Sequence, residues 1–309
     1  MRILVFEFMV GGGVADRHPL SGELQTFYQQ GHAMLKAVCE DLLQLGHEVV
    51  VPVDIHAGTF LPGSEVVRIS VERESDVTPT VFGAAEVADH ILLIAPETDG
   101  CLEHFAKLLS SFSNRFISPN IGFIRLTADK WKCHNWYSKR NVPCPESILV
   151  RENSEVPSHF FPCVVKPVDG AGSEDVRLVR SANELGAVEK PILLQKFVLG
   201  VPASVSVIIE SFEKVHYLEP GRQVFDAEPF GTHLRTEYPL DSDLRERALS
   251  LARLVVDASP NVIGYFGIDM VLAEEPDGDV VIEINPRLTS SYGFLRAWSG
   301  ENLAAKFPL

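Results

Sequence analysis

Two stretches near the carboxyl end of the sequence decide the fold: GYFGIDMVL at residues 264–272 and VVIEINPR at residues 280–287. Both are rich in aliphatic and β-branched residues, and Pro276-Asp277-Gly278 between them is a strong turn signal. The pattern predicts a β-hairpin. If residues 276–278 form a three-residue loop, Asp269 lies opposite Asn285.

Alternation along the two predicted strands places oxygen-bearing side chains on one face of the hairpin. Asp269, Glu283 and Asn285 share that face, and the apolar residues between them point the other way. Such hard oxygen ligands suit Mg²⁺, which proteins usually hold through one or two carboxylates while substrate phosphates complete its shell. The hairpin alone is equally compatible with acidic side chains on a solvated edge. The other motifs must therefore decide between a metal site and exposed surface acids.

Length and composition indicate a soluble globular protein. The chain has 309 residues, enough for about two domains with a sizeable core. Its content of 46% hydrophobic and 22% charged residues is ordinary for a soluble protein. A formal net charge of -15 argues against a nucleic-acid-binding or membrane-binding surface, because both need clustered Lys and Arg.

The sequence also indicates the cellular compartment and argues against disulfides, a zinc site and a membrane span. Five scattered cysteines without CxxC spacing indicate reduced thiols rather than disulfides or a zinc site, and the ten histidines show no pair at metal-ligand spacing. The apolar start is interrupted at Glu7 and ends at three glycines, so it is too short for a membrane span and poor as a signal peptide. We therefore expect a cytoplasmic protein.

The first part of the chain alternates predicted strands and helices. Strands are expected at residues 2–10, 47–53 and 90–95, with helices at 23–45 and 99–110. This alternation predicts a parallel, doubly wound sheet, whose ligands lie beyond the carboxyl ends of the strands. The run Gly11 to Gly13 would then lie in a binding crevice, although it lacks the spacing of a dinucleotide fingerprint.

The second part carries a lysine at the end of a strand and a glycine-containing loop. A helix opens near Lys130, and a strand at residues 161–167 contains Lys166. The loop that follows contains Gly170, Gly172 and Ser173, whose backbone N–H groups could cradle phosphate oxygens. It is not a Walker A loop, because the lysine precedes the glycines. Another strand is expected at residues 192–198.

Taken in order, these motifs resemble the set found in the ATP-grasp superfamily. They are Lys130, the segment from Lys166 to Ser173, the segment from Gln195 to Gly200, Asp269, and the segment from Glu283 to Arg287. The resemblance covers roughly residues 120–290. Within the superfamily, the glycine run, the helix before Gly46, Pro202-Ala203-Ser204 and residues 285–292 most resemble the tyramine–glutamate ligases of methanofuran biosynthesis and their bacterial relatives.

The resemblance implies a fold with two domains. Residues 1–119 would form a Rossmann-like α/β domain with a parallel sheet. Residues 120–309 would form an α+β ATP-grasp domain in which two β layers enclose the nucleotide. Its small nucleotide-binding lobe would span about residues 143–200, and its metal-binding lobe about residues 201–309.

The resemblance also implies roles for individual residues. Two lysines, Lys130 and Lys166, would reach the phosphates of ATP, and the loop with Gly170, Gly172 and Ser173 would close over them. Residues at the hinge strand would bind adenine: Gln195, Lys196, Phe197 and Val198. Three residues, Asp269, Glu283 and Asn285, would hold two Mg²⁺ ions, with Mn²⁺ as an acceptable substitute. Arg287 and Lys166 would be the catalytic residues, with Arg287 stabilising the transferring phosphoryl group or the carboxylate that attacks it.

The implied activity is that of an ATP- and Mg²⁺-dependent carboxylate–amine ligase that works through an acyl phosphate and releases ADP and phosphate. L-Glutamate and tyramine, or a similar amine, are the expected substrates, and homodimers are expected only because they are the commonest oligomers. The alternatives are a ligase for another amino acid or a pterin, a non-catalytic nucleotide-binding regulator, and a dinucleotide-dependent oxidoreductase.

The sequence also departs from the superfamily pattern. Pro202-Ala203 replaces the acidic residue that often binds ribose, and Gln195-Lys196 stands where a glutamate is common. Arg287 after Asn285, together with Ile263 in place of an arginine before the first metal ligand, argues against a D-alanine–D-alanine ligase. For the substrate pocket, Glu7, Arg222 and the glycine run are candidates.

Overall fold

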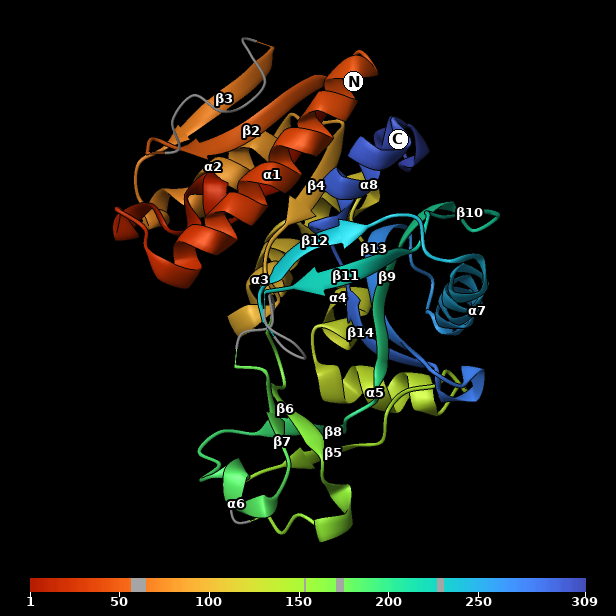
Figure 1. Ribbon diagram of the computed structural model, residues 1–309. Helices are drawn as coiled ribbons and strands as arrows, with labels where there is room; N and C mark the ends of the chain where they lie inside the picture. Colours follow the sequence, from red (N-terminus) through yellow and green to blue (C-terminus); the bar gives the residue numbers. More distant parts are fainter. Residues whose placement is uncertain (57–64, 153, 171–174, 227–230) are drawn as a thin grey trace.

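The computed structural model describes residues 1–56, 65–152, 154–170, 175–226 and 231–309, which form three β-sheets with flanking helices (Figure 1). The first sheet lies at one end of the molecule and the smallest sheet at the other, with the largest sheet between them. No helix of the described part is both long and apolar enough to cross a membrane.

The first sheet is parallel, with the order β3-β2-β1-β4. Its strands are β1 (Arg2–Glu7), β2 (Glu48–Asp54), β3 (Val66–Val71) and β4 (His90–Ile94), and its helices are α1 (Gly22–Gln44), α2 (Glu74–Glu86) and α3 (Cys101–Leu108). Both faces of β1 are buried. Ile3 and Val5 share a core with α1, whereas Leu4 and Phe6 share another with α2 and α3. This explains why the strand reads as a continuous apolar run, and it confirms the predicted α/β sheet.

The glycine run after β1 differs from the sequence-based expectation. The strand ends at Glu7 rather than at residue 10, and Met9–Gly13 form one buried helical turn. Gly12 has a φ of 100°, and a Cβ at Gly11 would lie 2.6 Å from the Phe6 ring. These glycines are therefore required by backbone conformation and close packing. The run is a buried helical turn rather than the loop that the sequence predicted, and its role in substrate binding stays a prediction.

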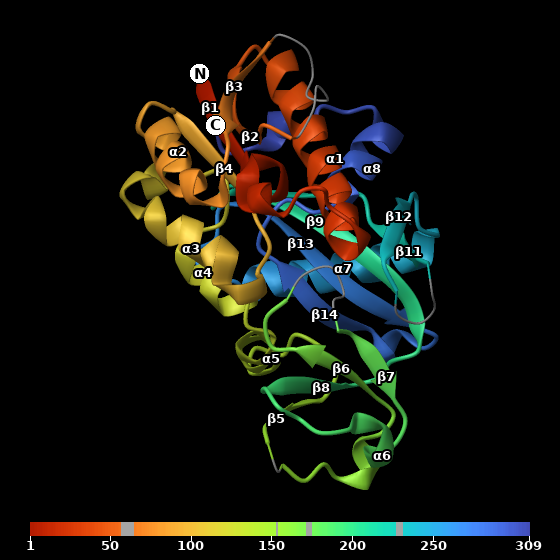
Figure 2. The same ribbon diagram turned by 90° about the vertical axis from the view of Figure 1, so that its left-hand side faces the viewer.

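The other two sheets are antiparallel (Figure 2). The small sheet has the order β5-β8-β6-β7 and consists of β5 (Ser147–Val150), β6 (Cys163–Pro167), β7 (Arg177–Val179) and β8 (Ile192–Lys196). The large sheet has the order β12-β11-β9-β13-β14, with β10 paired to β9. Its strands are β9 (Gly200–Ser211), β10 (Lys214–Tyr217), β11 (Gly221–Phe225), β12 (His233–Glu237), β13 (Gly264–Ala273) and β14 (Val280–Asn285).

Five α-helices in the described part of the chain accompany these sheets: α4 (Ile121–Thr127), α5 (Lys130–Ser138), α6 (Ala182–Leu185), α7 (Ser242–Ala258) and α8 (Ser291–Ser299). The Asp129 side chain caps α5 by accepting a hydrogen bond of 2.9 Å from the Lys132 N–H, which fixes where Lys130 begins the helix. The α/β sheet followed by two antiparallel β layers is the fold class that the sequence predicted.

The predicted hairpin exists, but its register was predicted wrongly. Asp269 pairs with Glu283, and Asn285 pairs with Gly267. Two features account for the difference. The pairing stops at Val271 and Val280, so the connection is longer than three residues, and the register shifts between Asp269 and Met270.

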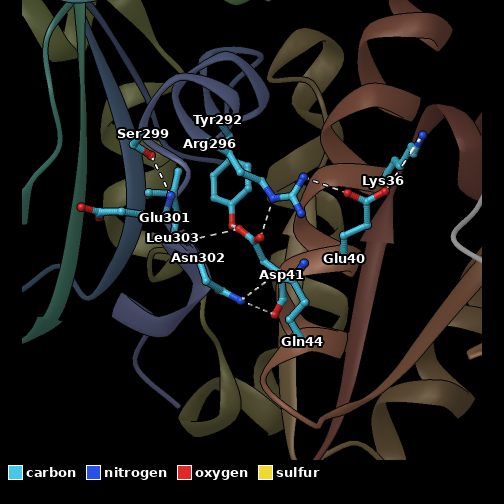
Figure 3. Close-up of polar contacts among 10 residues, drawn as sticks. All are labelled: Lys36, Glu40, Asp41, Gln44, Tyr292, Arg296, Ser299, Glu301, Asn302 and Leu303. Carbon is cyan, nitrogen blue, oxygen red and sulfur yellow. Dashed lines mark hydrogen bonds and ion pairs between the residues drawn. The ribbon is translucent and has the colours of Figure 1, made fainter.

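The end of the chain returns to the first sheet, where α8 packs against α1 (Figure 1). Figure 3 shows the buried carboxylate of Asp41, on α1, at the centre of this contact. It accepts hydrogen bonds of 2.6 Å from the Tyr292 hydroxyl and 2.5 Å from Arg296 Nε. The Asn302 amide donates to the Asp41 carbonyl at 2.8 Å. Residues more than 250 positions apart are thereby joined.

Candidate functional site

Two lysines from different elements act on the carboxylate of Glu283 on β14, Lys130 by contact and Lys166 through its charge. Lys130, at the start of α5, places Nζ 2.9 Å from Glu283 Oε1. Lys166, at the end of β6, is only 4% exposed and interacts electrostatically with Glu283. Burial would raise the pKa of Glu283, but the charges of Lys130 and Lys166 outweigh it and lower the pKa below its usual value.

The ionisation of the two lysines reflects their surroundings. Burial, followed by the charge of Lys130, lowers the pKa of Lys166 to about 8, although Glu283 and Asp269 oppose the shift. Burial would also lower the pKa of Lys130, but its contact with Glu283 raises that pKa above the ordinary value. Positive charge is thus concentrated beside the carboxylates, which suits the binding of an anion such as a phosphate.

Asp269 on β13 lies on the same face of the hairpin as Glu283 and Asn285. Its Oδ2 accepts a hydrogen bond of 2.8 Å from Asn285 Nδ2, and its Oδ1 accepts one of 3.0 Å from Gln223 Nε2 on β11. Burial and then the charge of Glu283 raise the pKa of Asp269 to about 6. The shared face is as predicted despite the changed register.

This donor set fits a divalent cation that prefers oxygen. Two carboxylates and one amide stand together, and the mutual repulsion of Asp269 and Glu283 is one cause of the raised pKa of Asp269. A bound Mg²⁺ would relieve that repulsion, and its oxygen-only preference matches the three side chains. Asp269, Glu283 and Asn285 are therefore the residues that would hold it.

Arg287 connects this site to the first sheet. Its Nη2 and Nε lie 3.0 and 3.2 Å from Oε2 of Glu97, which follows β4. Glu97 is buried, and its Oε1 has no hydrogen-bond partner among the described residues. Arg287 also interacts electrostatically with Glu7 at the end of β1. Arg287 thus lies between the predicted metal ligands and the carboxyl ends of the parallel strands.

The loop after β6 is anchored to the start of α5. The Lys130 N–H donates to the Val168 carbonyl at 2.9 Å, and Lys130 Nζ donates to the Gly170 carbonyl at 2.7 Å. Across the loop, the Asp99 N–H donates to the Asp169 carboxylate at 3.2 Å. The other predicted phosphate-binding residues, Gly172 and Ser173, lie outside the described residues.

The predicted adenine-binding residues lie at the end of β8. Gln195 is buried and borders a small pocket that α5 and β14 also line, with Cys133, Tyr137 and Ile282 among its walls. The Lys196 N–H donates to the Glu146 carbonyl and the Phe197 N–H to the Pro162 carbonyl, so both backbone groups are bonded to residues next to strands of the small sheet. The Lys196 ammonium lies near the Phe160 ring, and Phe197 and Val198 are partly buried.

Sequence reasoning missed two residues of this constellation, Glu97 and Gln223. Glu97 could have been found, because it follows a predicted apolar strand and so belongs to the carboxyl edge of the sheet. Nothing in the sequence places Gln223 beside Asp269, because β11 meets β13 only through β9. Of the suggested substrate residues, Glu7 is buried near Arg287, whereas Arg222 is exposed on β11.

Curated relatives align with most of the chain. Tyramine–L-glutamate ligase of Methanocaldococcus jannaschii is 23% identical over 296 residues, which is 94% of this chain and 84% of that protein. A 3-methyl-D-ornithine–L-lysine ligase of Methanosarcina mazei is 24% identical over 217 residues, 68% of this chain and 54% of that protein.

Solved structures share the fold. A putative ATP-grasp superfamily protein from Archaeoglobus fulgidus superimposes with a TM-score of 0.72 at 19% identity, covering 96% of this chain and 88% of that one. The N5-carboxyaminoimidazole synthetase of Staphylococcus aureus, solved with ADP, gives a TM-score of 0.67 at 14% identity, covering 94% of this chain and 71% of that one.

The family follows from a match that spans the candidate site. The profile of the ATP-grasp domain matches residues 127–291, more than half of the chain. That segment begins just before Lys130 and ends just after Arg287, so it contains both lysines and all three predicted oxygen ligands. The chain therefore belongs to the ATP-grasp family.

Proposed function

We propose that this protein joins L-glutamate to tyramine, or to a closely similar aromatic amine, in a reaction driven by MgATP. The family and the shared chemistry of its relatives support an ATP-dependent ligase that forms a carbon–nitrogen bond between an acid and an amine. The choice of glutamate and tyramine is the proposal.

The observation that carries the proposal is the extent of the alignment. The match to tyramine–L-glutamate ligase covers 94% of the chain, including the first sheet, whereas the match to the D-alanine–D-alanine ligase of Sulfurimonas denitrificans covers 42%. The first sheet places Glu7 and Glu97 beside Arg287, so the resemblance extends to the part of the chain that borders the site.

The chemistry requires an activated acid, because a carboxylate does not condense with an amine at neutral pH. A carboxylate oxygen attacks the γ-phosphorus of ATP, the bond to the bridging oxygen breaks, and ADP leaves an acyl phosphate behind. The amine nitrogen then attacks the carbonyl carbon, the carbon–oxygen bond to phosphate breaks, and the nitrogen loses a proton. Both steps depend on positioning and charge neutralisation rather than on a protein nucleophile.

Each residue of the site has a separate role in this reaction. Lys130 and Lys166 bind phosphate oxygens as point charges, and Arg287 stabilises the negative charge that moves with the phosphoryl group. Asp269, Glu283 and Asn285 would hold Mg²⁺, which would supply charge neutralisation for the phosphates. The Lys130 ammonium also pairs with Glu283 at 2.9 Å, so it would lie beside both a phosphate oxygen and a ligand of the metal.

The test is a coupled assay for ADP release with MgATP and a panel of acids crossed with amines, followed by mass detection of products. We expect ADP release that needs both glutamate and an aromatic amine and yields the condensed amide. Release of AMP would contradict the acyl phosphate route. Nucleotide binding without turnover across a wide panel would favour a regulatory protein.

The same panel addresses a second candidate, the coupling of two amino acids. This candidate is favoured by the resemblance to 3-methyl-D-ornithine–L-lysine ligase and by the fold shared with an L-amino acid ligase of Bacillus licheniformis, at a TM-score of 0.65. Turnover with glutamate and a second amino acid, but not with tyramine, would replace the first candidate by this one.

A further inference from the structure

A second cluster of metal-ligating side chains lies at the carboxyl end of β2, on the first sheet. Asp54, the last residue of β2, has a fully buried side chain. Its Oδ2 lies 2.7 Å from His18 Nε2, and its Oδ1 lies 2.9 Å from His56 Nδ1. The two imidazole rings stack with centroids 4.6 Å apart. The three ligand atoms lie within 4.8 Å of one another.

Separation in sequence hid this cluster. The sequence predicted no pair of histidines at metal-ligand spacing, because His18 and His56 lie 38 positions apart in the chain. The fold brings them together, because His18 follows the glycine turn after β1 and His56 follows β2, the adjacent parallel strand. Two strand ends on one edge of a sheet therefore supply all three side chains.

The donor chemistry differs from that of the hairpin site. Two imidazole nitrogens and one carboxylate oxygen are ligands that suit Zn²⁺ and similar transition metals, and three protein ligands leave one position open. The hairpin site offers oxygen atoms only, which suits Mg²⁺. The two sites would therefore select different cations from the same solution.

A neighbouring hydroxyl points independently to a ligand. Tyr28 on α1 is 7% exposed, and its hydroxyl has no hydrogen-bond partner among the described residues. Its ring lies edge-on to His18 with centroids 6.1 Å apart. Burial, then the charges of Asp54 and Glu7, raises the pKa of Tyr28 to about 12. A buried, unpaired hydroxyl is costly, and a water or anion held on a metal here would give it a partner.

We infer that His18, Asp54 and His56 form a binding site for a transition-metal cation of the Zn²⁺ class, with an open coordination position on the side of Tyr28. The inference does not depend on the ligase reaction, because none of the three residues belongs to the site that would hold ATP and Mg²⁺. It adds a second metal of different chemistry to the edge of the first sheet.

The experiment measures Zn²⁺ affinity by competition with a chromophoric chelator, in excess Mg²⁺ so that the oxygen-only site is occupied. The proteins compared are the unaltered chain and the variants His56→Ala, His18→Ala and Asp54→Asn. His104→Ala is the matched control, because His104 is an exposed histidine on α3. Circular dichroism establishes that each variant is folded, and half-exposed His56 is the substitution least able to disturb folding.

The expected result is a single equivalent of Zn²⁺ bound by the unaltered chain. Each histidine variant should lower the affinity by at least about tenfold, since even loss of an outer-shell partner costs about that much. His104→Ala should leave the affinity unchanged. Absence of stoichiometric binding by the unaltered chain, or equal affinity in the folded His56→Ala protein, would overturn the inference. Neither outcome would affect the proposed ligase activity, because no ligase substrate enters the measurement.

Discussion

Glu283 interacts electrostatically with three other charged residues of the candidate site, Lys130, Lys166 and Asp269. Glu283→Gln removes the charge but keeps the shape of the side chain. We expect kcat to fall by about a hundredfold to a thousandfold, because the variant loses a carboxylate ligand of the Mg²⁺ that would neutralise the reacting phosphate. The measurement is ADP release together with thermal unfolding of the variant.

Glu274→Gln is the control for this substitution, because Glu274 is an exposed acid in the connection of the same hairpin. It should retain normal turnover. A Glu283→Gln protein that turns over at the rate of the unaltered chain would remove Glu283 from the metal site.

The ionisation of Glu7 should lower the free energy of unfolding as the pH rises. Burial raises its pKa from 4.5 to about 7, despite a hydrogen bond of 2.8 Å from the Val10 N–H. The folded state therefore holds the proton more tightly than the unfolded state. The resulting stabilisation is complete below pH 4.5 and is lost as the pH rises through about 7.

In the unaltered chain we expect this ionisation to lower the free energy of unfolding by about 1–3 kcal/mol. Glutamine cannot ionise, so the Glu7→Gln protein should not show this decrease. Urea denaturation at about pH 4.5 and about pH 8 measures it. Glu86→Gln, at an exposed position on α2, should keep the pH dependence of the unaltered chain. If Glu7→Gln keeps it too, Glu7 is ionised in the folded protein over this whole range.

At the scale of elements, the β13–β14 hairpin shows how far the sequence can be interpreted. Alternation identified the two strands and the shared face of Asp269, Glu283 and Asn285, because side-chain direction depends only on the period of a strand. The register was wrong, because it depends on how the connection folds. There Asp279 accepts hydrogen bonds from the Ala273 N–H and from Arg247 on α7, a partner that the local sequence cannot reveal.

This connection can be tested by removing one charge. Arg247 Nε and Nη2 lie 2.8 and 2.5 Å from the Asp279 carboxylate, and both residues are largely buried. Asp279→Asn should lower the free energy of unfolding by about 2–3 kcal/mol, because the Arg247 charge loses its partner. Chemical denaturation measures the loss.

Asp277→Asn, two residues earlier in the same connection, is the matched control, since Asp277 is exposed. It should change the free energy of unfolding by less than about 0.5 kcal/mol. Equal losses in the two variants would mean that the turn, not the Arg247–Asp279 pair, determines the stability of the connection.

For the whole molecule, the sequence predicted what is local or repeated and missed what is distant. The parallel sheet and the position of Lys166 near the end of β6 follow from periodicity and from strand-end rules, whereas the two antiparallel layers were implied by the resemblance to the ATP-grasp superfamily. The pairing of Arg287 with Glu97 joins residues 190 positions apart, and His18 meets His56 only through the order of the sheet. Such pairs depend on how domains and strands come together, which no single stretch of sequence specifies.

The contact between α1 and α8 joins residues that are still farther apart in the sequence, and its contribution to stability can be tested. The Asp41 carboxylate accepts from Tyr292, Arg296 and the Leu303 N–H, all from the carboxyl-terminal segment (Figure 3). Asp41→Asn should lower the free energy of unfolding by about 3 kcal/mol, because it leaves the Arg296 charge poorly compensated. Hydrogen exchange should accelerate in α1 and α8.

The small sheet should respond differently, because its β6–β8 pairing lies in a hydrophobic core separate from that of α1 and α8 and should keep its exchange protection in the variant. Glu40→Gln is the control. Glu40 neighbours Asp41 and contacts Arg296 at 2.8 Å, but its side chain is 28% exposed. It should cost less than about 1 kcal/mol. Equal exchange in both variants would mean that apolar packing of α8, rather than the buried carboxylate, fastens the end of the chain to the first sheet.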